Sequence, residues 1–380
     1  MGIIIGGDFV PTESNLNCFI NGDYRGFIGE RLLMIIRNAD YRIFNLEMPL
    51  TDNMNPIEKA GPNLVAPAKA VNGYSSINVD MLTLANNHIL DQGAKGLEDT
   101  ETALKDVGIH FAGTGHNLKE ASAPFVFSMW NKTIGVYACA EREFSIASER
   151  ECGANPFDPL DSLDHIFDLK KKCDFVIVLY HGGKEHYPYP SPNLKKRCEK
   201  MVLKGADLVI CQHSHCIGCI EEYDEGTIVY GQGNFLFGRS EINSWNEGLV
   251  IELNPDFSIS YIPITVDKEG KCVDVADIEE TERILNTINQ RSEEIKSNRF
   301  VEEQYAIFAK SMVDYYLKAF SGKESILFKV LNKISGNRIR QFKLNKMYTK
   351  HTRTVIRNYI ECEAHHELVI EALKRNYFKY

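Results

Sequence analysis

The sequence predicts an α/β domain followed by a C-terminal helical appendage. Up to about residue 265, short runs of β-branched and other apolar residues alternate with helical patterns, which is typical of layered α/β domains. From about residue 277 the helical period continues and strand signals vanish. The 380 residues are 44% hydrophobic and 25% charged, a composition that indicates a folded globular protein and excludes the disordered, collagenous and membrane-spanning classes.

Near-continuous apolar runs in the first half of the chain predict buried strands. They cover residues 3–6, 41–45, 81–85, 109–112, 133–138, 175–180 and 208–211. Helical patterns lie between them, at 26–37, 94–107, 163–171 and 193–204. We therefore expect central strands that are covered by helices.

The pattern changes after residue 218. Shorter strand-like segments separated by turns, at 220–223, 228–230, 249–253 and 258–264, predict antiparallel pairing. Beyond them, the stretches 284–296, 303–320 and 361–376 have a helical period. We place the domain boundary between residues 275 and 276, with a main domain at 1–275 and a helical appendage at 276–380.

Polar side chains follow five of the predicted strands. Because the carboxyl ends of strands in open α/β sheets form the ligand-binding edge, residues far apart in the sequence should meet there. Each residue alone has an ordinary interpretation, such as a turn or a helix cap, but five coincidences favour a shared site. A set of carboxylate, amide and imidazole groups suits Mn, Zn or Fe, so the sequence predicts a divalent transition-metal site for one or two ions. The residues are Asp8, Glu47, the run Asn86-Asn87-His88, His181 and the run His213-Ser214-His215.

A closed structural zinc site is a competing interpretation of the same region. Its ligands would be Cys211, His213, His215, Cys216 and Cys219. This spacing matches no common zinc finger, and Cys211 belongs to a buried apolar run.

Three motifs carry a resemblance to a known family. Asn45-Leu46-Glu47, Asn86-Asn87-His88 and Gly231-Gln232-Gly233-Asn234-Phe235 occur in the order and spacing of the CapA-type proteins. These proteins are associated with bacterial capsule and poly-γ-glutamate synthesis, and their domain is similar to the calcineurin-like metallophosphoesterases. The resemblance covers about residues 1–240. It implies a four-layer α/β/β/α sandwich, with two sheets between helices and a metal site at one edge.

The resemblance also implies roles for individual residues. Glu47 takes the place of a carboxylate that bridges two metals; Asn87, His181 and His213 would complete one metal, and Asp8 and His215 would serve the other. His88 would be the general acid that protonates the leaving group. We further expect substrate-binding roles for Asn45, Asn86, Lys184, Glu185 and Asn234.

Two positions depart from the phosphoesterase pattern. Val10 stands where phosphoesterases have the histidine of an Asp-x-His motif, and Glu47 replaces an aspartate. One metal therefore loses a ligand, and phosphatase activity does not follow from the resemblance alone.

We expect an enzyme: a CapA-like metal-dependent hydrolase in which metal-activated water attacks a phosphoester or amide bond. Its substrate would be an anionic small molecule or polymer of capsule, poly-γ-glutamate or cell-surface polymer biosynthesis. The alternative, motivated by Val10, is a non-catalytic accessory protein of polymer assembly that binds an anionic chain or a synthase partner.

The net charge of −9 argues against a nucleic-acid partner, but it is the sum of two opposed parts. Residues 321–357 hold ten basic residues and one acidic residue, a balance of +9, which leaves −18 for the remainder. Apolar residues are interspersed in this basic segment, so it could form an amphipathic helix that contacts an anionic membrane surface or a synthase partner, or that packs on the acidic main domain. Ten cysteines without a secretion signal predict a cytoplasmic protein, which could be peripheral at the membrane.

Overall fold

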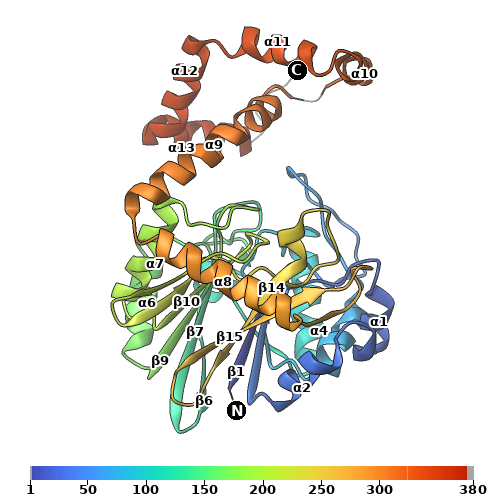
Figure 1. Cartoon of the computed structure of the whole chain (residues 1–380), viewed down its shortest axis with the longest axis vertical. Coiled ribbons are helices and arrows are strands. Elements are labelled where there is room, and N and C mark those ends of the chain that lie inside the picture. The colour runs from blue at the N-terminus through green and yellow to red at the C-terminus, as the bar shows by residue number, and fades with distance from the viewer. Residues whose placement is uncertain (1, 323, 375–380) are drawn as a thin grey trace. The chain divides into compact units, whose positions relative to one another are not determined.

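A computed structural model describes residues 2–322 and 324–374 of the chain (Figure 1). The parts of the expected appendage at 323 and 375–380, including the end of the helix expected over 361–376, lie outside the described residues. The chain forms two compact units, Met1–Tyr305 and Ala306–Tyr380, so the division falls later than the boundary expected between 275 and 276.

The first sheet contains the N-terminal strands of the chain. Its central strands β1, β2, β3 and β4 are parallel, whereas β14, β15 and β16 continue the sheet in antiparallel fashion, as the turn-rich pattern after residue 218 predicted. The order is β16-β15-β14-β1-β2-β3-β4, and β13 pairs with β1. The strands are β1 (Ile3–Phe9), β2 (Tyr41–Asn45), β3 (Met81–Thr83), β4 (His110–Ala112), β13 (Asn234–Leu236), β14 (Glu247–Leu253), β15 (Ile259–Val266) and β16 (Val273–Val275).

The second sheet has the order β11-β12-β10-β9-β7-β6. Its four inner strands are parallel, and its two edge strands pair antiparallel. The strands are β6 (Phe125–Met129), β7 (Lys132–Ala140), β9 (Phe175–His181), β10 (Leu208–Gln212), β11 (Ile220–Tyr223) and β12 (Gly226–Val229). A separate two-stranded ladder joins β5 (Thr114–Gly115) and β8 (Gly153–Ala154).

The two sheets pack face to face, and helices cover both outer faces (Figure 1). Side chains of successive strand residues point to opposite faces, so Ile3 and Ile5 enter the core between the sheets while Ile4 enters the core under the helices. This arrangement confirms the predicted four-layer α/β/β/α sandwich. The helices of the first sheet are α1 (Leu16–Asn21), α2 (Glu30–Asn38), α3 (Val71–Ser76) and α4 (Gly93–Asp106), those of the second are α6 (Ser162–Lys170) and α7 (Pro192–Leu203), and a short α5 (Leu118–Ala121) contacts β5.

The helix α8 (Ile278–Glu294) belongs to the first unit, because its Ile284 and Ile288 are buried in the core between the sheets. The helix α9 (Asn298–Phe320) crosses the division of the two units. The second unit continues with α10 (Ile326–Ile334), α11 (Arg338–Met347), α12 (Lys350–Glu361) and α13 (Glu363–Lys374). The predicted C-terminal helices are thus confirmed. None of the described helices combines the length and apolar character that crossing a membrane requires.

Candidate metal centre

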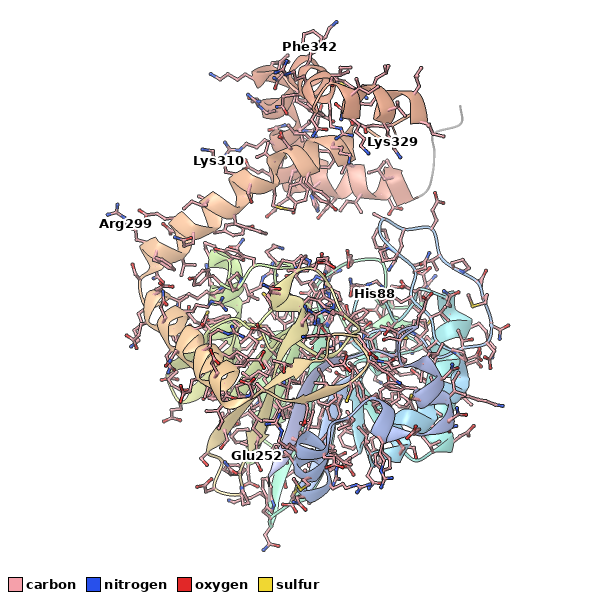
Figure 2. The ribbon with its side chains drawn as sticks, turned by 45° about the vertical axis from the view of Figure 1, so that its right-hand side comes forward. His88, Glu252, Arg299, Lys310, Lys329 and Phe342 are labelled. Carbon is pink, nitrogen blue, oxygen red and sulfur yellow. The ribbon has the colours of Figure 1, made fainter. Side chains whose placement is uncertain are left out.

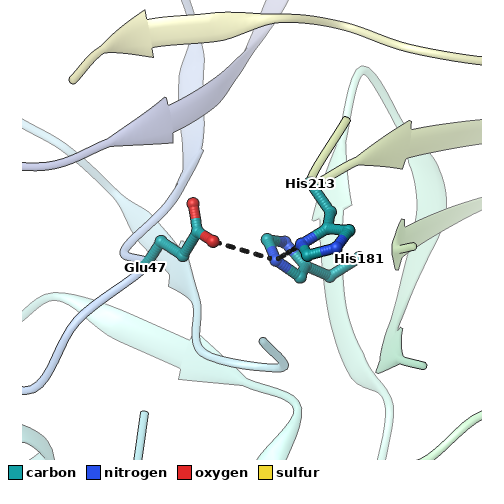
Figure 3. A group of neighbouring side chains, drawn as sticks. All are labelled: Glu47, His181 and His213. Carbon is teal, nitrogen blue, oxygen red and sulfur yellow. Dashed lines mark hydrogen bonds and ion pairs between the residues drawn. The ribbon is translucent and has the colours of Figure 1, made fainter. Parts of the chain in front are cut away.

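The predicted ligands come together at the carboxyl ends of parallel strands from both sheets. Asp8 lies in β1 and Glu47 follows β2, while His181 ends β9 and the two remaining histidines follow β10. They form two groups in which the ligand atoms lie within 4.8 Å of one another. One group is Glu47, His181 and His213 (Figure 3), and the other is Asp8, Glu47 and His215. Glu47 is common to both groups, at the position expected for a bridging carboxylate.

The two histidines after β10 reach the site because the backbone turns at each of them. His213 has φ 82° and His215 has φ 50°, both in the left-handed region that residues other than glycine rarely adopt. In an extended strand, the side chains of residues i and i+2 would point to the same face but would be displaced from one another along the strand axis. Here the turn brings both imidazoles to the same edge, with ring centroids 6.0 Å apart.

The first group converges on one nitrogen of His181. Its Nε2 lies 3.2 Å from Glu47 Oε1, 3.2 Å from His213 Nδ1 and 3.1 Å from Asn87 Oδ1. Figure 3 shows the Glu47 carboxylate and the His213 ring directed at His181 from opposite sides. Ligand atoms of three of the residues expected to hold one metal therefore lie within 3.2 Å of the fourth, His181.

The second group is built around Asp8 and His215. Asp8 Oδ2 lies 3.5 Å from His215 Nδ1, which also lies 2.9 Å from Asn234 Oδ1. Asn234 is opposite Asp8 in the β1–β13 pairing, and its Nδ2 donates to the carbonyl of Trp245. Gly7 permits this pairing, because a Cβ there would lie 2.2 Å from the Gly233 carbonyl oxygen.

Val10 does not take part in this group. It is fully buried in the hydrophobic core under the helices, and its backbone N–H donates to the carbonyl of Leu236 at 2.8 Å. The second group thus has no side chain from this position, as the departure from the phosphoesterase pattern implied.

Buried carboxylate oxygens without partners indicate that a cation belongs in the site. Among the described residues, Asp8 Oδ2 and both Glu47 oxygens are buried without a hydrogen bond, and the nearest nitrogens are those of His215, 3.5 Å from Asp8 Oδ2, and His181, 3.2 Å from Glu47 Oε1. Burial, together with the neighbouring Glu47 charge, raises the pKa of Asp8 to about 8. Burial likewise raises the pKa of Glu47 to about 8, although His88 opposes this effect. Since unpaired buried charge is strongly unfavourable, this donor set fits a divalent metal ion.

The histidines have the opposite response to burial, which disfavours their charged forms. Burial lowers the pKa of His181 and of His213, and it lowers that of His215 to about 3. All three rings are therefore neutral at neutral pH, the state in which imidazole binds a metal.

His88 follows the predicted ligand Asn87, and its imidazole contacts Asp91 and Lys59. Its Nδ1 lies 2.6 Å from Asp91 Oδ2, and Lys59 Nζ lies 3.1 Å from the same nitrogen while it also forms an ion pair with Asp91. The sequence did not single out Asp91, although the His-x-x-Asp spacing was a usable signal. The Lys59 side chain is only 3% exposed, so it belongs to the buried surroundings of His88 rather than to the surface.

The residues expected to bind substrate fall into two classes. Asn45, Asn86 and Asn234 are buried, and their amides support the site: Asn45 Nδ2 donates to Asp8 Oδ1 at 2.7 Å, and Asn86 Nδ2 donates to the Leu46 carbonyl at 2.7 Å. Lys184 and Glu185 lie nearer the surface, with Lys184 Nζ 3.9 Å from Glu141. These positions favour a positioning role for the three asparagines, and substrate contact by any of the five stays a prediction.

The structure gives no support to the zinc site built on cysteine. Cys211, Cys216 and Cys219 are buried free thiols, and neither ligand group found among the described residues contains a cysteine. Cys211 Sγ instead lies 3.6 Å from Cys198 Sγ within the core under α7.

Comparison with known proteins places these features in context. A sequence model of a protein family described as "Bacterial capsule synthesis protein PGA_cap" matches residues 2–239. The chain is 31% identical over 226 residues to the capsule biosynthesis protein CapA of Bacillus anthracis, which covers 57% of this chain and 54% of that protein. It is 28% identical over 221 residues to the PGA biosynthesis protein CapA of Bacillus subtilis (strain 168), covering 57% and 58%. The match thus spans little more than half the length of these relatives.

Solved structures are similar at lower levels of identity. A putative 5'-nucleotidase from Staphylococcus aureus aligns with a TM-score of 0.43 and 14% identity, over 76% of this chain and 58% of that one. A phosphatase from Mycoplasma pneumoniae aligns with a TM-score of 0.41 and 16% identity, over 75% and 96%.

Proposed function

The chain belongs to the bacterial capsule synthesis protein family, as its motifs predicted, and from this premise we propose that it is a metal-dependent hydrolase of cell-surface polymer biosynthesis. The bond cleaved would be a phosphoester or an amide in an anionic substrate, such as a capsule or poly-γ-glutamate intermediate. One observation carries the proposal: Glu47 is shared by two ligand groups, and both of its oxygens are buried without partners.

The chain's own residues would hold the metal as follows. Glu47, Asn87, His181 and His213 offer one set of ligands, and Asp8 and His215 share Glu47 to offer a second, smaller set. A divalent Mn, Zn or Fe ion bound there supplies Lewis-acid stabilisation of developing negative charge and lowers the pKa of water. Asn45 keeps the two sets in register, because its Nδ2 donates to Asp8 and lies 3.3 Å from His181 Nδ1.

His88 acts as the proton donor in this proposal. In the imidazolium form, His88 would donate from Nδ1 to the Asp91 carboxylate and give its Nε2 proton to the leaving group, which leaves a neutral imidazole. Lys59 balances the buried charge of Asp91 and fixes that carboxylate in place. Asp91 and Lys59 are therefore positioning residues that act through His88.

The test joins metal analysis to a substrate screen. Protein purified without chelator should contain stoichiometric transition metal and should hydrolyse a member of a panel of phosphodiesters, phosphomonoesters and γ-glutamyl amides. Glu47→Gln and His181→Ala should lose both metal and turnover, whereas Glu58→Gln, at an exposed position of the loop after β2, should keep both. Absence of bound metal from the wild-type protein would contradict the proposal.

A non-catalytic accessory function is the second candidate, and the core position of Val10 favours it. A protein with an incomplete second ligand set could keep the fold and bind an anionic chain without cleaving it. Stoichiometric metal together with no turnover on the whole panel would support this function, while turnover abolished by His88→Asn at unchanged metal content would exclude it.

A further inference from the structure

The helix α10 has its apolar face outward. Five residues, Ile326, Leu327, Val330, Leu331 and Ile334, are exposed, with Ile326 at 81% and Ile334 at 78%. Their spacing of i, i+1, i+4, i+5 and i+8 places them on one face of the helix. We call these five residues the apolar stripe. A helix that packs on a globular core would bury such a stripe.

The opposite face of α10 packs against α11, so the fold of the hairpin leaves the apolar stripe exposed. Asn332 is buried: its Nδ2 donates to Asn337 Oδ1 at 2.7 Å, and its Oδ1 accepts from the backbone N–H of Arg340 at 2.9 Å. Phe328, on the same inner side, has the Lys343 ammonium over its ring at 5.0 Å. These contacts join α10 to α11 as a helical hairpin, residues 326–347, and they leave the stripe facing away from α11.

The hairpin is strongly basic. Residues 326–347 contain six basic residues and no acidic residue. Lys329 and Lys333 are exposed on α10 beside the apolar stripe, and Phe342 on α11 is 71% exposed (Figure 2). One of these six basic residues, Arg340, forms an ion pair with Glu324, with Arg340 Nη2 2.7 Å from Glu324 Oε2. An exposed apolar face flanked by lysines is the pattern of helices that lie in the interface of anionic membranes.

We propose that the hairpin 326–347 is a peripheral docking surface for an anionic phospholipid membrane. The apolar stripe would enter the boundary between headgroups and acyl chains, and the flanking lysines would meet lipid phosphates. This inference is independent of the metal site and of the hydrolase proposal.

Charge and the distribution of apolar residues favour a membrane over the other occupants. A second copy of the hairpin would bring six further basic residues against the first six, which opposes self-association. The acidic main domain complements the positive charge of the hairpin, but it has few exposed apolar side chains that could pack against the apolar stripe. Among the described residues, twenty exposed large hydrophobic side chains lie in 306–374 against nine in 2–305, and those nine are spread over separate helices, strands and loops.

The test is sedimentation of the full chain with vesicles. Binding is expected to vesicles of phosphatidylcholine with 30% phosphatidylglycerol, and to fall on addition of salt; pure phosphatidylcholine should bind much less. Each basic residue near an anionic surface contributes about a fivefold factor, so Lys329→Glu with Lys333→Glu should weaken binding by roughly 25-fold or more. Leu327→Asp with Ile334→Asp should abolish it.

Matched controls carry the same chemical changes on the main domain. Lys172→Glu with Lys268→Glu alters charge equally, and Leu160→Asp changes another highly exposed leucine; both should bind like wild type. Three results would overturn the proposal: no binding of the wild-type chain to anionic vesicles at low salt, equal loss in the control variants, or a dimer in ultracentrifugation that Ile334→Asp dissociates, which would assign the stripe to a second copy. Circular dichroism of each variant should match that of the wild-type chain, as a control that its helices are kept.

Discussion

Removing the charge of Glu47 should stabilise the metal-free protein. Both carboxylate oxygens are buried without partners, and burial raises the pKa of this group from 4.5 to about 8. At pH 7 the folded protein must therefore keep a proton that the unfolded chain releases. Glu47→Gln keeps the size of the side chain and removes that requirement.

The size of the effect follows from the two pKa values of Glu47. Stability from a group whose folded pKa is raised is fully present below the unfolded value and is lost as the pH rises to the folded value. Between 4.5 and pH 7 there are 2.5 pH units, each equivalent to about 1.4 kcal/mol, which gives about 3–4 kcal/mol in favour of the variant. The difference between variant and wild type should be small below pH 4.5, widen up to about pH 8, and then stay constant.

Urea unfolding in the presence of chelator, from pH 5 to pH 9, measures this difference. Glu101→Gln is the matched control, because Glu101 is also buried but accepts from Thr114 Oγ1 at 3.0 Å and pairs with Lys105. That variant should be neutral or destabilised. With Mn²⁺ in place of chelator, the wild-type protein should become more stable than Glu47→Gln, since only the wild-type protein gains stability from metal binding. If Glu47→Gln is destabilised in chelator at pH 7 as Glu101→Gln is, the inference of a metal site from orphaned oxygens is refuted.

Further predictions concern the support of His88 and the cysteines. Asp91→Asn should lower turnover by about 10²-fold or more while metal content stays unchanged, because His88 loses the carboxylate that orients it; metal analysis beside the rate measurement would separate this from a ligand defect. Lys59→Met should destabilise the fold by about 3–5 kcal/mol, since it removes the cation paired with the buried Asp91 charge, and a denaturant midpoint equal to that of wild type would contradict the ion pair. Cys216→Ser and Cys219→Ser should keep their metal content, and loss of metal on either change would revive the cysteine zinc site.

The sequence predicted the sheets well where strands are buried on both faces. Near-continuous apolar runs gave β1, β2, β9 and β10, and the structure buries each of these strands completely. The strand β6 was missed; it is an edge strand whose residues alternate between half-buried and exposed. The helix α10 lies in the basic segment that was expected to form an amphipathic helix, although its bounds were not predicted.

Prediction of the candidate site from the sequence was likewise only partly successful. Strand ends predicted which ligands would meet, because topology alone brings them to one edge. The positive φ at His213 and His215 could not be predicted from residue type, since neither is a glycine. Asp91 was missed although the His-x-x-Asp spacing was a usable signal, whereas Lys59 lies in the long loop between β2 and β3, which has no periodic pattern.

The buried carboxylates of the first unit separate into two kinds, and this distinction gives the metal site its support. Asp91 is fully buried, yet it has an ion pair with Lys59, a contact with His88 and a hydrogen bond from the Leu64 backbone N–H at 2.6 Å. Asp8 and Glu47 are buried to the same degree, but three of their four oxygens accept nothing in the part of the chain that the structure describes. Folded proteins rarely leave buried acceptors unpaired. These oxygens belong to two acids that contact each other and face neutral histidines, and a bound cation would neutralise both adjacent carboxylates at once.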